Sequence, residues 1–77
     1  MDYDTDAVDA AALGLMYLGL THDGTATWKG YPWEVTERLF EAGYIENPRT
    51  KNKSLALTPK GQAAVEEHFQ RLFERLP

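Results

Sequence analysis

The chain has 77 residues, a formal net charge of −4 and no cysteine. This length allows one small domain, expected over residues 1–77, and the lack of cysteine excludes disulfides and thiolate metal sites. The acidic start and the absence of a long apolar run predict no export signal and no membrane span, so we expect a cytoplasmic protein.

The first predicted element is a helix that begins at Asp4 or Thr5 and runs to about Leu20. Both residue types are favourable N-caps, and the aspartates that follow suit the positive end of a helix. From Ala10 onward the segment has no charged residue, and a helix that is apolar on all sides must be buried on all sides. Because so short a chain has little core, we expect this helix to contact a second copy of the protein. In the alternative, Leu13 and Leu20 lie beneath the C-terminal helix of the same chain.

A turn, a short strand and a second helix are predicted next. The "DG" pair at 23–24 indicates the turn, and "TATWK" at 25–29 alternates as a strand does. A helix is predicted over residues 32–43, because proline suits a first helical turn and glycine suits a C-cap. Its exposed side is expected to carry Glu34, Glu37, Arg38 and Glu41.

The following segment predicts a β-hairpin and a last helix. "YIE" and "SLALT" alternate apolar and polar residues around the polar tip "NPRTKNK" at 47–53. Thr58 at the N-cap and Pro59 at the first position then begin the helix. Its apolar residues, with the spacing of a coiled-coil seam, are Val65, Phe69, Leu72 and Leu76.

Two phrases, "LFEAGYI" and "LALTPKG", stand at the ends of the second helix and of the hairpin. The residues that define them are Leu39, Gly43, Tyr44, Ile45, Leu57, Thr58 and Gly61. In this order the chain resembles the winged-helix family, whose recognition helix and wing end in such phrases. The resemblance implies an α+β, winged-helix-like fold of three helices with a small antiparallel sheet or hairpin (the wing), in the order α-β-α-β-β-α. With its "MDYDTD" start and "WKGYPW" centre, the chain also resembles a family of small bacterial proteins of unknown function, which implies no activity.

The basic residues are concentrated in one segment. Residues 44–60 have a net charge of +3, because four basic residues there oppose only Glu46. Phosphate contacts dominate the affinity of proteins for DNA, whereas the acidic exposed side of the helix at 32–43 disfavours insertion into the major groove. We therefore predict that DNA is contacted through the hairpin, by Arg49, Lys51, Lys53 and Lys60. The alternative is a solvated hairpin whose lysines keep the sheet edge from pairing with other chains.

A second function class is a protein-interaction adaptor. Its binding surface would combine the aromatic residues of "WKGYPW" with the acidic helix, namely Trp28, Tyr31, Trp33, Glu37, Arg38 and Glu41. The alternative for Trp28 is burial against the first and last helices, since aromatic side chains mostly fill cores.

For the expected homodimer, the predicted interface consists of Leu13, Tyr17, Leu20, Phe69, Leu72, Phe73 and Leu76. Neither His22 nor His68 has a companion with metal-ligand spacing, and the chain has no glycine-rich phosphate loop. We therefore expect a protein that is not an enzyme and has no metal site and no cofactor.

Overall fold

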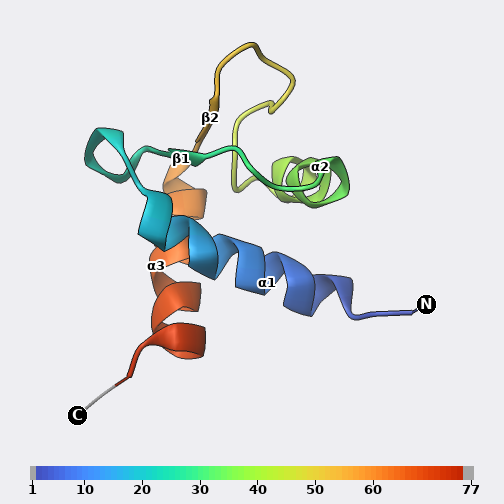
Figure 1. The fold of residues 1–77 in the computed structure, drawn as a ribbon, viewed down its shortest axis with the longest axis vertical. Coiled ribbons are helices and arrows are strands. Elements are labelled where there is room, and N and C mark those ends of the chain that lie inside the picture. Colours follow the sequence, from blue (N-terminus) through green and yellow to red (C-terminus); the bar gives the residue numbers. More distant parts are fainter. Residues whose placement is uncertain (1, 76–77) are drawn as a thin grey trace.

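The computed structural model describes residues 2–75, apart from the side chain of His22. The elements in chain order are α1 (Thr5–Met16), the 3-10 turns η1 (Tyr17–Gly19) and η2 (His22–Gly24), β1 (Ala26–Trp28), α2 (Trp33–Glu41), β2 (Ser54–Ala56) and α3 (Pro59–Phe73). Helices α1 and α3 cross each other, and the sheet, α2 and the loop before β2 lie to one side of α1 (Figure 1).

The sheet is antiparallel, with β1 paired to β2 so that Thr27 stands opposite Leu55 and Trp28 opposite Ser54. Ile45 adds an isolated antiparallel bridge to Leu57, just beyond β2. Of the predicted hairpin, only the second arm is a strand, and its partner strand is β1. The first arm is reduced to the single bridge at Ile45, so the observed order matches the predicted α-β-α-β-β-α only roughly. The α+β class is confirmed, with three helices and a two-stranded sheet in the part of the chain that the structure describes.

One core lies between α1, α2, the sheet and the first half of α3. Its largest fully buried side chains are Leu13, Met16, Leu39, Ile45, Leu55, Val65 and Thr27. The Thr27 hydroxyl donates to the carbonyl oxygen of Met16 at 3.0 Å, which compensates its burial. Leu13, which we assigned to a dimer interface, instead lies in the core of its own chain and is 1% exposed. Leu13 therefore has no surface left for a second copy.

The predicted helix ends follow local cap chemistry. Asp4 caps α1, since its side chain accepts a hydrogen bond from the N–H of Ala7. Helix α1 ends at Met16, earlier than expected, and continues as the 3-10 turn η1. At the end of α2, Gly43 has a φ of 87° and donates its N–H to Phe40, and Tyr44 donates to Leu39. These two bonds form a Schellman motif, which satisfies carbonyl groups at the end of the helix.

The end of α2 is joined to the start of α3 by a set of short contacts between residues 42–44 and 58–61, which we call the α2–α3 junction. The Thr58 N–H donates to the carbonyl oxygen of Tyr44 at 3.0 Å. The Thr58 hydroxyl donates to the carbonyl oxygen of Gly43 at 2.6 Å and accepts from the N–H of Gly61 at 3.0 Å. Thr58 therefore caps α3 and anchors the end of α2 at the same time. The two phrases that carry the winged-helix resemblance meet at this junction.

Replacing Gly61 by Ala tests the closeness of the junction. A Cβ at Gly61 would overlap the carbonyl oxygen of Tyr44, which belongs to the backbone and cannot rotate away. We expect a loss of at least about 2 kcal/mol in the free energy of unfolding, or roughly 10 °C in Tm, measured by thermal denaturation.

Gly14→Ala is the matched control, because both glycines lie in helices where alanine is intrinsically favoured. A Cβ at Gly14 would meet the ring of Phe73 at 2.8 Å, and this ring is 43% exposed and able to rotate. If the Gly61→Ala protein is as stable as the Gly14→Ala protein, the close approach of Gly61 to the Tyr44 carbonyl group is wrong.

Candidate functional site

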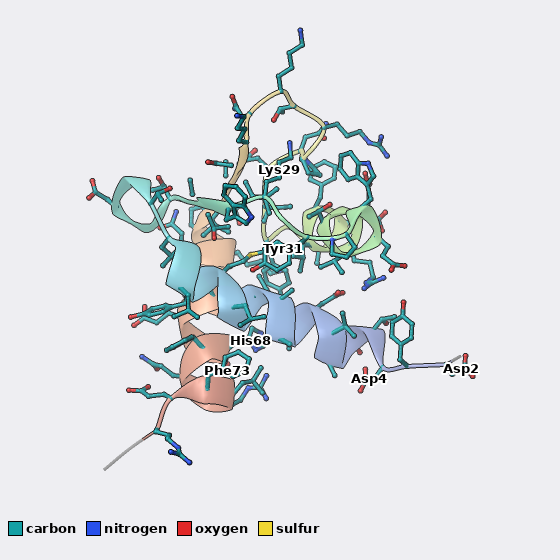
Figure 2. The ribbon with its side chains drawn as sticks, viewed as in Figure 1. Asp2, Asp4, Lys29, Tyr31, His68 and Phe73 are labelled. Atoms are coloured by element: carbon teal, nitrogen blue, oxygen red, sulfur yellow. The ribbon has the colours of Figure 1, made fainter. Side chains whose placement is uncertain are left out.

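The loop between Ile45 and β2 is held in place by Lys29. Its ammonium group donates to the carbonyl oxygens of Thr50 at 3.0 Å and Asn52 at 3.1 Å. Figure 2 shows Lys29 between β1 and this loop. An ammonium group is a donor of three hydrogen bonds and suits a cluster of carbonyl oxygens. Lys29 is thus a structural cation that closes the loop onto the sheet.

Arg49 fastens the same loop to α2. Its Nη2 lies 2.8 Å from Oε1 of Glu37, and its guanidinium carbon lies 5.1 Å from the centre of the Trp33 ring. The Glu37 oxygen is buried, so this ion pair compensates its charge. Within the loop, the side chain of Asn47 accepts from the N–H of Arg49 at 2.9 Å. Arg49, predicted to bind nucleic acid, therefore has a contact inside the protein.

Lys60 and Arg38 are also engaged internally. Lys60 donates to the carbonyl oxygen of Ala42 at 2.7 Å, where a positive charge suits the C-terminal end of α2, and lies 4.8 Å from the centre of the Tyr44 ring. Arg38 forms two hydrogen bonds with the carboxylate of Asp9, at 2.7 and 2.8 Å. The hydrogen bond from Asp9 raises the pKa of Arg38. Both cations therefore have partners within the fold.

Lys51 and Lys53 differ from these cations. Both are exposed, and in the part of the chain that the structure describes neither has a hydrogen bond or an ion pair. The loop thus presents two unpaired ammonium groups, whereas the two other predicted nucleic-acid contacts, Arg49 and Lys60, are used within the fold.

The outer face of the sheet lies beside Lys53, which directly precedes β2. Since Thr27 and Leu55 point into the core, their neighbours along each strand point outward. Trp28 is 68% exposed, so the alternative in which it fills the core is wrong. A hollow of about 330 Å³ on this face is lined by Ala26, Asn52, Lys53, Ser54 and Ala56. We did not assign Ser54 to a site from the sequence, because its role follows from the pairing with Trp28.

The residues predicted for a protein partner do not form one free surface. Glu37 and Trp33 contact Arg49, and Arg38 contacts Asp9. Tyr31 is half-buried against the core, on the side that faces α1 (Figure 2), and this burial raises the pKa of its phenol. Trp28, Trp33 and Glu41 are nevertheless exposed. The surface left for such a partner is therefore mainly aromatic.

An apolar surface extends over α1, η1 and the second half of α3. The Tyr17 and Phe69 rings stack at 4.3 Å between centroids, and Phe69 meets Phe73 edge-on at 6.1 Å. We call these three residues the aromatic row. Leu18 is 72% exposed and Leu72 is 41% exposed. Of the other predicted interface residues, Leu20 is partly buried against the core, and Leu76 lies outside the described residues.

A further hollow, of about 280 Å³, lies where the three helices meet. It is lined by Asp6, Asp9, Ala10, Leu13, Arg38, Leu39, Ala42, Tyr44 and His68. His68 Nδ1 accepts a hydrogen bond at 2.7 Å from Nη2 of Arg71, one turn further along α3. Among the described residues, no cluster of three His, Asp or Glu side chains is arranged to bind a metal ion. In the same part of the chain no helix combines the length and the apolarity that crossing a membrane requires.

Residues 4–75 match the family described as "Domain of unknown function (DUF6429)". The chain belongs to this family. The uncharacterized protein y4hR of Sinorhizobium fredii (strain NBRC 101917 / NGR234) is 47% identical over 75 residues, which cover 97% of this chain and 100% of the relative. No solved structure matches the chain. The expected membership of a family of unknown function is thus confirmed.

Lys29→Met tests whether the loop depends on its structural cation. Methionine keeps most of the apolar stem but removes the donors to Thr50 and Asn52. We expect the loop to open more easily by about 1 kcal/mol, seen as roughly fivefold faster amide hydrogen exchange in residues 46–53. The matched control is Lys51→Met, which removes a lysine of the loop itself and should leave the exchange unchanged. Equal exchange in both variants would show that Lys29 does not hold the loop.

Proposed function

We propose that the protein is a non-catalytic, cytoplasmic binding module that contacts nucleic acid through the loop at residues 46–53. The observation that supports this most is the division of the loop's cations: Arg49 is bound to α2, whereas Lys51 and Lys53 are exposed and unpaired among the described residues. Exposed ammonium groups without a partner are available to phosphates, and such contacts supply most of the affinity for nucleic acid.

The charge of α2 indicates that nucleic acid is contacted by the loop and not by this helix. Glu34 and Glu41 are exposed, and the Arg38 guanidinium is bound to Asp9. A helix with this surface is repelled by the phosphates that line a major groove. With two free lysines, the affinity should be modest and should fall with added salt, with a slope of about two in a logarithmic plot.

The double variant Lys51→Ala/Lys53→Ala tests the proposal by fluorescence anisotropy with labelled nucleic acid at low salt. We expect at least about tenfold weaker binding, because both phosphate contacts are removed. Arg75→Ala is the control, since it removes an exposed positive charge that follows α3, away from the loop, and should bind as the wild type does. Binding that survives the loop variant, or that does not respond to salt, would contradict the proposal.

A second proposed property is self-association, favoured by the apolar surface that contains the aromatic row. Leu18, Leu72 and Phe73 are exposed without a covering element in the described chain. Glu67 and Arg71 lie one turn apart on α3, on either side of Phe69 in the sequence. If a two-fold axis passes midway between them, antiparallel α3 helices place Glu67 of each copy opposite Arg71 of the other, so the surface suits a second copy of itself.

Leu18→Glu/Leu72→Glu tests the dimer. Both side chains are exposed, so the fold should survive, but two buried carboxylates should abolish association. We expect sedimentation velocity to show a dimer for the wild type and a monomer for this variant, with Lys51→Glu as a dimeric control. A wild type that is monomeric up to about 100 μM would contradict the dimer, because specific interfaces are usually tighter than this.

The remaining alternative is a protein-interaction adaptor, favoured by the exposure of Trp28 at 68% and Trp33 at 54%. In that case neutralising Lys51 and Lys53 would leave partner binding intact, whereas replacing the tryptophans would weaken it.

A further inference from the structure

We infer that the ligand of this site is single-stranded nucleic acid, with a base stacked on Trp28 and phosphate groups bound by Lys53 and Lys51. This inference rests on the proposed function and specifies the class of nucleic acid. The single-stranded nucleic acid would lie on the outer face of the sheet, next to the lysines of the loop.

Trp28 has the properties of a stacking platform. It projects from the outer face of β1 and is 68% exposed, although large aromatic side chains usually fill the core of a small domain. Its indole lies directly against Gly30, where a Cβ would overlap the ring. On the strand, the Cβ of Trp28 is close to Gly19. The indole is therefore positioned before any ligand arrives, and little side-chain freedom is lost on binding.

Trp28 does not line the hollow on the sheet, but its cross-strand partner Ser54 does, and this hollow has the chemistry that an unpaired base and its phosphate require. Ser54, the cross-strand partner of Trp28, supplies a hydroxyl group, and Asn52 supplies an amide. Lys53 supplies an ammonium group next to them, while Ala26 and Ala56 leave the floor of the hollow open. Hydroxyl and amide groups can donate to and accept from base edges, and an ammonium group binds phosphate.

Stacking on an indole needs a base that is not already stacked in a duplex, so the platform favours a single strand. The features that would favour a duplex are blocked. Lys29 and Arg49 hold the loop to the sheet and to α2, so it does not project as a free arm into a groove. The acidic side of α2 is unsuited to a major groove, as Glu34 and Glu41 show.

The helical hollow gives no competing site for a polyanion. Asp6 and Asp9 lie in its lining, and its cation, Arg38, is already bound to Asp9. Asp6 therefore leaves negative charge in the lining of that hollow and, among the described residues, no cation there is free, whereas the hollow on the sheet is lined by Lys53 and by no described carboxylate. The charge distribution directs a polynucleotide to the sheet.

The test measures the affinity of the full chain for labelled oligo-dT, oligo-rU and a mixed-sequence duplex of equal length at low salt. Both single strands, or one of them, should bind more tightly than the duplex, and the preferred one identifies DNA or RNA. Trp28→Ala should weaken single-strand binding by about 5- to 150-fold, and Trp28→Phe should retain most of it. Trp33→Phe leaves Trp28 as the one tryptophan, whose fluorescence should be quenched by the oligonucleotide.

Two results would overturn the inference. If the duplex binds more tightly than both single strands, or if Trp28→Ala binds a single strand as the wild type does, the proposed contact through the loop stands but the stacked single strand does not. If no nucleic acid binds at low salt, both the inference and the proposed function fail. Circular dichroism of Trp28→Ala checks that the fold is intact, as the exposure of this side chain predicts.

Discussion

The contact of Gly61 with the carbonyl group of Tyr44 is the constraint on which the arrangement of the fold depends. It brings the first turn of α3 against the end of α2, so closely that the position excludes a side chain. Thr58 completes this contact by capping α3 while it binds the end of α2. The bridge between Ile45 and Leu57 begins directly beyond the junction and sets where the hairpin starts. The loop at 46–53 must then return across α2 and β1, where Arg49 and Lys29 bind it.

The positions of the cations follow from this path and explain how an acidic protein can present a basic surface. Four cations bind carbonyl or carboxylate oxygens within the fold, namely Lys29, Arg38, Arg49 and Lys60. Hydrogen bonds from charged donors are stronger than those between neutral groups, and the buried Oε1 of Glu37 would have an uncompensated charge without Arg49. What remains around the sheet is a small patch with two lysines and one tryptophan. Because the patch makes only a few contacts, one copy of the protein is expected to bind weakly. Self-association would bring two such patches together and raise the apparent affinity.

Features that depend only on neighbouring residues could be predicted from the sequence. The caps at Asp4, Gly43 and Thr58 are local, because each side chain or glycine acts within one helical turn. The orientation of α1 was not predictable in the same way, since its second half is apolar on every side and its periodicity does not identify the buried face. Leu13 was therefore assigned to an interface, although it lies in the core. Trp28 presented a similar problem, because a three-residue strand has two faces and only the register with Leu55 shows which one is buried. The internal roles of Lys29 and Arg49 depend on the three-dimensional path of the loop and have no local signal.

A titration of the isotope-labelled protein with a single-stranded oligonucleotide, followed by two-dimensional NMR of the backbone and indole N–H groups, would test this interpretation most directly. Shifts are expected at the indole N–H of Trp28 and at residues 51–54, with α2 and the aromatic row unaffected. Shifts centred on Tyr17, Phe69 and Phe73, or on the exposed glutamates of α2, would contradict it and place the binding surface elsewhere in the molecule.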